Sequence, residues 1–182
     1  MSKNTEEIIK DAALTVFAEE GYVGAKTRII AEESGFSEMT LFRKFKNKEK
    51  LFDTILIEEK KRIVGEANEL FKSNKLEDPL ESLRLLIKQI YKLIEENFQC
   101  ISLYINERRR VSECVLDEVM IHVGSQIKLK FPDIKMNIKV LAFTILSFLY
   151  NLIFDKYKGY SFINHEEALE EFIGYTTKIV TT

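Results

Sequence analysis

The sequence predicts an all-α protein of about nine helices. Glycine (7) and proline (2) are scarce among the 182 residues, while leucine, isoleucine, glutamate and lysine are plentiful, a balance that favours helices over a sandwich or barrel. Apolar residues recur at helical spacing, and no stretch alternates as a half-buried strand would. The length allows one domain, or a small domain attached to a larger one.

Capping residues and glycines mark the first two helices. Asn4, followed three residues later by Glu7, is a capping arrangement for a helix that Gly21 ends. A second, short helix covers residues 27–34 and is broken by Gly35. The inner face of the first helix is predicted to carry Ile9, Ala12, Ala13, Val16 and Phe17.

A third and a fourth helix follow. The third covers roughly residues 37–45, and Asn47 caps a long fourth helix whose exposed side carries the acidic-then-basic run EEKKR. The segment SNKLEDP then interrupts the helical pattern. The apolar positions of the fourth helix are Leu51, Phe52, Ile55, Ile63 and Leu70.

Five further helices are expected beyond that break. Asp78 as a cap and Pro79 at the first helical position restart the chain, and apolar residues recur at helical spacing up to Phe98. Two more helices cover about 100–112 and 113–130.

The last two helices close the chain. Pro132 and Asp133 are expected to begin an apolar helix that ends near Gly159. Asn164 with Glu167 then caps a final helix.

The stretch VLAFTILSFLYNLIF, residues 140–154, is a candidate membrane span. It is shorter than the roughly 20 residues that a span needs, and polar residues interrupt it. We interpret it as a helix buried on two faces, against its own core and against a partner, and we expect no membrane association.

Residues 27–45 have the spacing of a helix-turn-helix. Ala31 supplies the small residue where two helices cross, and Gly35, four positions later, tolerates the positive φ of the turn. The apolar residues that lock the two helices together are Ile30, Phe36, Leu41 and Phe45. Five Lys and Arg residues lie within residues 43–50, although the chain has 27 Lys and Arg against 29 Asp and Glu. This local pattern predicts binding to double-stranded DNA.

Four short motifs carry a family resemblance. FAEEGY, TRIIAEESGFS, TLFRKF and NKEKLF occur in this order within residues 5–56. The segment resembles the N-terminal DNA-binding domain of the TetR family of bacterial transcriptional regulators. The resemblance implies an N-terminal helix-turn-helix DNA-binding domain over residues 1–47, and a C-terminal helical bundle for effector binding and dimerisation over residues 48–182.

The resemblance also implies roles for individual residues. Thr27 and Lys48 are at positions where the family contacts phosphates, and Arg28 is where some members reach into the groove. The other residues predicted to contact DNA lie along the recognition helix and just after it: Ser37, Glu38, Met39, Thr40, Phe42, Arg43, Lys44 and Lys46.

Three of these residues allow alternative interpretations. Many members have Tyr where this chain has Phe42, so a phosphate hydrogen bond is lost and Phe42 packs against sugar or core. Many have Gly at position 39, where Met39 either holds the helix further from the DNA or contacts a thymine methyl. Glu38 either accepts from a cytosine amine, or repels phosphates and so favours correct sites over random ones.

The C-terminal helices are expected to form a homodimer. The helix over residues 134–157 has apolar side chains on several sides, more than one core can use. Paired with the helix near 165–180 and duplicated by a two-fold axis, it would form a four-helix interface. Two recognition helices about 34–36 Å apart would then read a pseudo-palindrome. The alternative is a monomer with one fully buried central helix.

The sequence indicates only weakly which residues would bind the small-molecule effector that the resemblance implies. An aromatic lining with a few polar anchors is typical of small-molecule pockets, and a cation would suit an acidic ligand. The candidate contacts are Tyr91, Tyr104, Arg108, Phe143, Ser147, Tyr150 and Asn151. Each of them also fits an ordinary place in a helical core or at a solvated helix end.

No catalytic or metal site is expected. The sequence has no nucleophile paired with a base, no glycine-rich phosphate loop and no paired carboxylates at catalytic spacing. Cys100, Cys114, His122 and His165 form no metal-binding set, and the two cysteines fit reduced thiols. The charged N-terminus lacks an apolar signal segment. We therefore expect no cofactor and a cytoplasmic location.

Three functions are compatible with the sequence. The first is a ligand-responsive, homodimeric repressor that a small-molecule effector releases from a pseudo-palindromic operator. The second is a DNA-binding regulator without a small-molecule effector. The third is a helical ligand-binding module whose helix-turn-helix is vestigial, and specific DNA binding would separate it from the other two.

Overall fold

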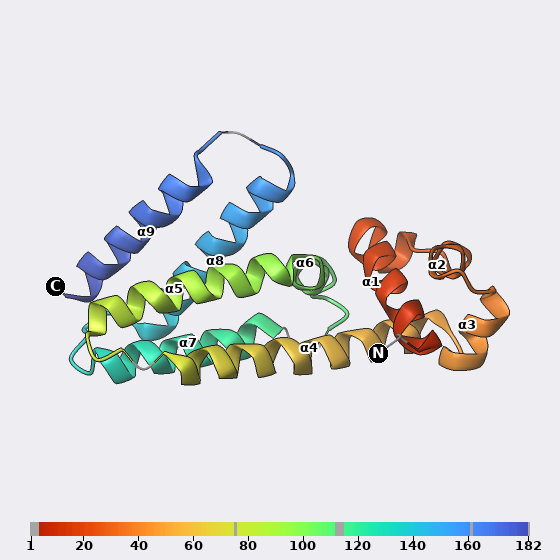
Figure 1. Cartoon of the computed structure of the whole chain (residues 1–182), viewed down its shortest axis with the longest axis horizontal. Coiled ribbons are helices and arrows are strands. Elements are labelled where there is room, and N and C mark those ends of the chain that lie inside the picture. Colours follow the sequence, from red (N-terminus) through yellow and green to blue (C-terminus); the bar gives the residue numbers. More distant parts are fainter. Residues whose placement is uncertain (1–3, 75, 112–114, 161, 182) are drawn as a thin grey trace. The chain divides into compact units, whose positions relative to one another are not determined.

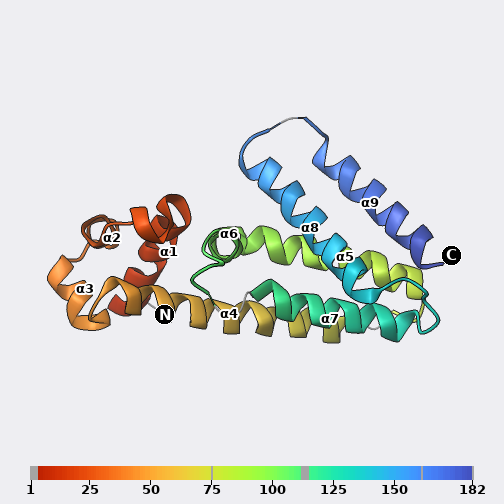
Figure 2. The ribbon, with the colours of Figure 1, turned by 180° about the vertical axis from the view of Figure 1, so that it is seen from behind.

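The computed structural model describes residues 4–74, 76–111, 115–160 and 162–181. Within these residues every regular element is an α-helix, and nine helices follow one another along the chain (Figures 1 and 2). The all-α class predicted from composition and periodicity is confirmed. The chain divides into two compact units, Met1–Arg62 with Gln99–Cys114, and Ile63–Phe98 with Val115–Thr182.

The first unit contains the predicted helix-turn-helix. It comprises α1 (Thr5–Gly24), α2 (Thr27–Ser34), α3 (Glu38–Phe45), the first part of α4 (Lys48–Ser73) and most of α6 (Phe98–Asn106). Helix α2 packs against both α1 and α3. A single core therefore holds the three N-terminal helices together.

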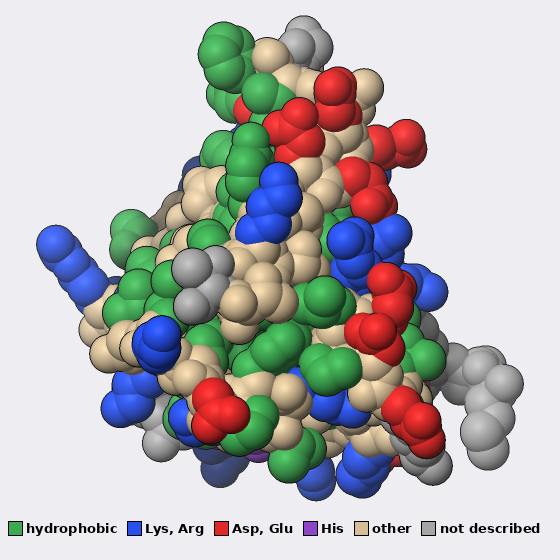
Figure 3. All heavy atoms as spheres, turned by 90° about the vertical axis from the view of Figure 1, so that its left-hand side faces the viewer, with side chains coloured by type: hydrophobic (Ala, Val, Ile, Leu, Met, Phe, Trp, Pro, Cys, Tyr) green, Lys and Arg blue, Asp and Glu red, His purple; other side chains and the backbone are tan. Residues whose placement is uncertain are grey.

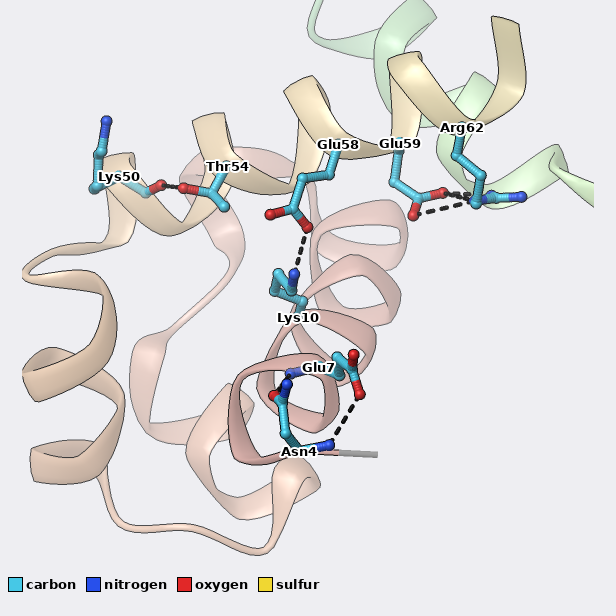
Figure 4. Close-up of polar contacts among 8 residues, drawn as sticks. All are labelled: Asn4, Glu7, Lys10, Lys50, Thr54, Glu58, Glu59 and Arg62. Atoms are coloured by element: carbon cyan, nitrogen blue, oxygen red, sulfur yellow. Dashed lines mark hydrogen bonds and ion pairs between the residues drawn. The ribbon is translucent and has the colours of Figure 1, made fainter. Parts of the chain in front are cut away.

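The predicted caps explain where the first helices begin. The side chain of Asn4 accepts a hydrogen bond from the backbone N–H of Glu7 at 3.0 Å, and the Glu7 carboxylate accepts one from the Asn4 N–H at 2.9 Å (Figure 4). Asn47 likewise accepts from the N–H of Lys50 at 2.7 Å where α4 starts. Gly21, with a φ of 68°, interrupts the helical geometry near the end of α1, as predicted.

Packing between α1 and α4 closes the core of this unit. The rings of Phe17 on α1 and Phe52 on α4 meet edge to face, with centroids 5.0 Å apart. Closer to solvent, the ammonium group of Lys10 on α1 pairs with the carboxylate of Glu58 on α4 (Figure 4). The fully buried side chains of this core include Ile9, Phe17, Ile30, Leu41, Leu51 and Leu103.

The second unit is a helical bundle. It contains the rest of α4 together with α5 (Pro79–Glu96), α7 (Val115–Lys130), α8 (Ile138–Tyr157) and α9 (His165–Val180). Helix α8 packs against α5, α7 and α9, and α5 also packs against α7 and α9. The predicted capping residue Asp78 accepts from the N–H groups of Leu80 and Glu81 and so starts α5.

Helix α8 is apolar and long enough to pass a simple test for a membrane span, with a mean hydropathy of 1.6. About 39 % of that apolar window is buried inside the chain, against the three neighbouring helices. The core helix of a globular protein passes the same test. The remaining apolar surface of α8 lies open on this single chain.

The start of α8 differs from the prediction. The helix begins at Ile138 and not at Pro132–Asp133. Asn137 is the cap, because its side chain accepts from the N–H groups of Lys139 and Val140. A capping side chain thus decided the start, while the proline lies in the preceding turns.

The ends of α5 and α6 were also predicted too far along the chain. Helix α5 ends at Glu96, and Phe98 opens α6. Between them Asn97 has a φ of −112° and folds its side chain back onto the carbonyl of Leu93 at 2.9 Å. Helix α6 ends at Asn106 and not near residue 112, because residues 107–110 form turns.

Candidate nucleic-acid interface

The turn of the helix-turn-helix depends on Gly35. Its φ of 73° and ψ of 16° are left-handed, and a Cβ placed there would meet nothing within 4 Å. The backbone conformation, and not lack of space, therefore favours glycine. The N–H of Phe36 donates to the carbonyl of Ala31 at 3.0 Å, which satisfies the end of α2.

Burial confirms the residues predicted to join α2 and α3. Ala31, at the predicted crossing point, is 3 % exposed. Ile30, Leu41 and Phe45 are buried as well, while Phe36 is half-buried. One side of α3 is thus fixed to the domain, which leaves the other side free.

The free side of α3 carries the predicted base-reading residues. Ser37 caps the helix by accepting from the N–H of Thr40 at 3.2 Å. Met39 is 80 % exposed and Phe42 40 % exposed, and Arg43 is exposed beside them. Large apolar side chains in water are costly, so their place on this face suits contact with thymine methyls and sugars in a major groove.

Two of the predicted cationic contacts have acidic partners within the chain. Arg28 pairs with Glu32 one turn later at 2.7 Å, and Lys44 pairs with Glu6 on α1 at 3.1 Å. All four side chains are at least one-third exposed. Exposed ion pairs stabilise a protein by roughly 0–1 kcal/mol each. Phosphates can therefore displace these carboxylates.

A tight turn centred on Lys46 joins α3 to α4. Lys46 has a φ of 65° and a ψ of −50°, and among the described non-glycine residues it alone has a positive φ. The N–H of Asn47 donates to the carbonyl of Phe45 at 2.8 Å, which closes a three-residue turn. Such a conformation costs on the order of 1–3 kcal/mol. The exposed Lys46 therefore lies at a strained junction directly after the recognition helix.

Four residues form what we call the Tyr22 cluster: Tyr22, Lys48, Glu107 and Arg110. The N–H of Tyr22 donates to Oε1 of Glu107 at 2.7 Å. The Arg110 guanidinium lies 4.1 Å from the centre of the Tyr22 ring, and the Lys48 ammonium lies 4.7 Å from it. The turn after α6 is thereby attached to the end of α1 and the start of α4.

Sequence reasoning missed this cluster. The prediction for this segment was an effector contact at Arg108, or else a solvated helix end, and no local pattern joins residues 85 positions apart. A weak signal existed in Gly21, because an aromatic residue directly after a helix-ending glycine often packs back onto the core.

Lys48 is held inside the first unit. Its ammonium group donates to the carbonyl of Ala25 at 2.5 Å and lies 3.4 Å from that of Val23. Burial, and then the nearby Arg110 guanidinium, lower the pKa of Lys48 below its ordinary value, although Glu107 opposes this. The predicted phosphate contact thus has a second role in the structure, which is to fix the connection between α1 and α2.

Two residues predicted to contact an effector belong to the first unit. Tyr104 is 1 % exposed, and its hydroxyl donates to the backbone carbonyl of Leu56 on α4. Arg108 is exposed in the turn after α6. In this structure Tyr104 therefore joins α6 to α4.

Four others lie on α8 in the second unit. Phe143 is 60 % exposed, and the exposed Asn151 donates to the carbonyl of Ser147 at 2.7 Å. Tyr150 is half-buried and stacks on Phe98, with ring centroids 5.8 Å apart. Their spacing of i, i+4, i+7 and i+8 places all four on one side of α8, but neither of the two grooves described below is lined by them, so the prediction of a common lining stays a prediction.

The seventh, Tyr91 on α5, lies beside a salt bridge. Lys156 on α8 pairs with Glu95 at 2.7 Å. Burial, and then the Glu95 carboxylate, raise the pKa of the Tyr91 phenol above its ordinary value.

Two buried polar atoms and two grooves lie apart from the predicted effector residues. Within the described residues, Oε1 of Gln89 and Nδ1 of His122 are buried without a hydrogen-bond partner. Such atoms call for a water molecule or a ligand group. A groove of about 400 Å³ is lined by residues 130–136 and 179–181, and one of about 600 Å³ by α1 and α2. Neither groove is lined by the predicted effector residues.

No group of three or more His, Cys, Asp or Glu side chains in the described part of the chain could hold a metal ion. Cys100 is buried. Cys114 lies outside the described residues.

These observations define the class of protein: a helix-turn-helix, DNA-binding regulator with a helical C-terminal bundle. Residues 9–55 match the family model of the bacterial regulatory proteins of the tetR family. The predicted resemblance is thereby confirmed for the N-terminal segment, since residues 9–55 match the DNA-binding domain of the TetR family of transcriptional regulators.

One sequence relative and two solved structures show how far the likeness extends. YvkB, an uncharacterized HTH-type transcriptional regulator of Bacillus subtilis (strain 168), is 42 % identical over 52 residues, which is 29 % of this chain and 28 % of YvkB. The match thus spans less than a third of that curated relative.

The structural likeness covers nearly the whole chain. A tetR-family regulatory protein from Rhodococcus RHA1 has a TM-score of 0.75 at 17 % identity over 98 % of each chain. AibR, solved with isovaleryl coenzyme A and operator DNA, has a TM-score of 0.69 at 16 % identity over 94 % of this chain and 97 % of AibR. At such identities the likeness concerns the fold.

Proposed function

We propose that the protein is a cytoplasmic, homodimeric repressor that binds a pseudo-palindromic operator and leaves it when a small-molecule effector binds. The observation that carries the proposal is α3, which is fixed by Leu41 and Phe45 on one side and exposes Met39, Phe42 and Arg43 on the other. Residues 1–47 are the DNA-binding domain in this proposal, and residues 48–182 bind the effector and the partner chain.

The open face of α8 and α9 supports the homodimer. Figure 3 shows hydrophobic side chains grouped at the surface on the side where α9 ends, between Lys, Arg and acidic residues. The exposed apolar residues of these two helices are Val140, Phe143, Tyr157, Tyr175 and Ile179. Grouped apolar side chains of this size mark interaction sites, and a two-fold axis would bury them in a four-helix interface. Sedimentation should give twice the mass of one chain.

The Tyr22 cluster supports the effector response. Because Glu107 and Arg110 follow α6 and contact Tyr22 directly, a shift of α6 changes the end of α1 and the start of α4. A full switch from bound to free needs about a 10⁴-fold difference in effector affinity between the two conformations. The unpartnered atoms of Gln89 and His122 offer polar anchors in the second unit.

A regulator without an effector is the second candidate. It is favoured by the two grooves described above, because both are open to solvent and do not enclose a ligand. In that case Gln89 and His122 bind water molecules, and the protein acts constitutively or through a protein partner.

Selection from a pool of randomised DNA duplexes tests the proposal. The dimer should enrich two half-sites whose centres are one helical turn apart, about 34–36 Å. Isovaleryl coenzyme A, the ligand of AibR, is the first effector probe, followed by other acyl thioesters. Release of the selected duplex by one of them supports the repressor, and tight binding unaffected by any of them favours the second candidate. Enrichment of no motif contradicts both.

Substitution of Lys48 and Arg43 separates phosphate contacts from base contacts. Lys48→Ala should weaken binding to selected and random duplexes alike, and reduce the slope of log K against log salt by about 0.9, as loss of one phosphate contact does. Arg43→Ala should change the selected sequence instead. Fluorescence anisotropy at several salt concentrations measures both effects.

The melting temperature of Lys48→Ala provides the control. Because Lys48 also holds the connection between α1 and α2, a lower stability with an unchanged salt slope would assign it to that connection alone. Equal effects of both substitutions on random DNA would contradict the division of roles.

A further inference from the structure

A hydrogen bond joins two residues that were predicted to contact DNA separately. The hydroxyl of Thr27, the first residue of α2, donates to Oε1 of Glu38, the first residue of α3, at 2.5 Å. Both side chains are half-buried. In the free protein the acid of the recognition helix is therefore turned toward the start of α2.

The start of α2 is a place that suits an anion. Its capping residue, Lys26, makes no side-chain hydrogen bond to the first turn, so the first N–H groups receive none from the cap. Those N–H groups and the helix dipole attract negative charge. The Glu38 carboxylate thus occupies, in the free protein, the surroundings that a DNA phosphate needs at Thr27.

A phosphate and Glu38 cannot both use this position. A threonine hydroxyl has one hydrogen to donate, and two anions within reach of it repel each other. Binding of a phosphate by Thr27 therefore requires Glu38 to turn away. On random DNA the displaced carboxylate faces further phosphates and acceptor-rich base edges, which weakens binding.

One kind of base edge can replace the hydrogen bond that the Glu38 carboxylate loses when it leaves Thr27. Residues in the first turn of a recognition helix contact base edges in the major groove. A carboxylate only accepts, and the exocyclic amines of cytosine and adenine are the donors there. The adenine amine is flanked by acceptors on both sides, N7 and the thymine O4, whereas the cytosine amine has an acceptor only on the guanine side. Cytosine is therefore the better partner.

We propose that Thr27 and Glu38 form an exchange pair that selects a C·G base pair: Glu38 releases the Thr27 hydroxyl to a phosphate only where cytosine accepts the carboxylate in its place. The inference rests on the proposed operator binding. The exchange pair combines the two interpretations of Glu38. The same carboxylate repels the phosphates of random DNA and binds cytosine at the correct site.

Glu38→Gln tests the proposal, with Glu33→Gln as its matched control. In Glu38→Gln the side-chain amide can still accept a hydrogen bond from Thr27, but the negative charge is gone. Glu33→Gln removes the same charge from an exposed position on α2. Glu38→Gln should bind a random duplex about tenfold more tightly at low salt, the order of one charged contact. Glu33→Gln should change this affinity less than about threefold.

Selection from randomised duplexes gives the second measurement. The wild type should enrich a C·G pair at one fixed position of each half-site, and Glu38→Gln should replace it with A·T, because an amide pairs with adenine N6 and N7. Unchanged base preference, or equal affinities of the two variants for random DNA, would overturn the exchange pair while operator binding stands. Failure of the wild type to enrich any motif would instead contradict the proposed function, and the exchange pair with it.

Discussion

Leu41→Ala will lower the free energy of unfolding of the first unit by about 2–5 kcal/mol and abolish binding to the selected duplex. Leu41 is 0 % exposed and lies on the side of α3 that faces the domain. Its truncation leaves a cavity between α3 and the core, and neighbouring helices relax only partly around such a cavity. Urea unfolding followed by circular dichroism measures the loss of stability, and anisotropy measures DNA binding.

Met39→Ala is the matched control on the opposite side of the same helix. Met39 is similar in size to Leu41 but is 80 % exposed, so its truncation should change stability by less than about 0.5 kcal/mol. Any effect on DNA binding should then appear at constant stability. Equal losses of stability for the two variants would contradict the assignment of the two faces of α3.

The helix-turn-helix was predictable because its determinants are local. Gly35, Ala31 and Leu41 lie within a few turns of one another, and each is required by backbone geometry or by contact between adjacent helices. The capping box of Asn4 and Glu7 is local in the same sense, since three residues separate its members. Such patterns can be recognised without knowledge of the rest of the fold.

Contacts between distant segments could not be predicted in this way. Tyr22 and Glu107 are 85 residues apart, and their hydrogen bond depends on where α6 packs. The bond between Thr27 and Glu38 spans 11 residues, but it requires the turn between α2 and α3 to bring two helix starts together. The sequence pattern predicted separate DNA contacts for Thr27 and Glu38 but not their hydrogen bond, and it predicted no role for Tyr22 or Glu107.

The predicted effector residues show the same limit. Aromatic and polar residues at helical spacing are found in cores, at interfaces and in pockets alike. Tyr104, which was predicted to face a ligand, is fully buried and bonds to the backbone of α4, whereas Phe143 is open to solvent on α8. The tertiary arrangement of the helices, and not their composition, separates these cases.

Glu107→Ala will destabilise the first unit by about 1–3 kcal/mol, because it leaves the half-buried N–H of Tyr22 without an acceptor. The N–H of Tyr22 should exchange with solvent about tenfold faster or more, since about 1.4 kcal/mol corresponds to a factor of ten. The affinity for the selected duplex should fall as well, because the end of α1 and the start of α4 lose their attachment to the turn after α6. Hydrogen exchange resolved at Tyr22, and anisotropy, measure the two effects.

Glu107→Gln is the control that separates the hydrogen bond from the charge. Its amide oxygen can still accept from Tyr22, so it should keep slow exchange and most of the DNA affinity. Arg110→Ala, compared with Arg109→Ala, tests the contact with the ring, since of these two arginines it is Arg110 whose guanidinium lies over Tyr22. If Glu107→Ala left both exchange and DNA affinity unchanged, the turn after α6 would not support the DNA-binding helices. An effector acting on α6 would then need another route to the operator.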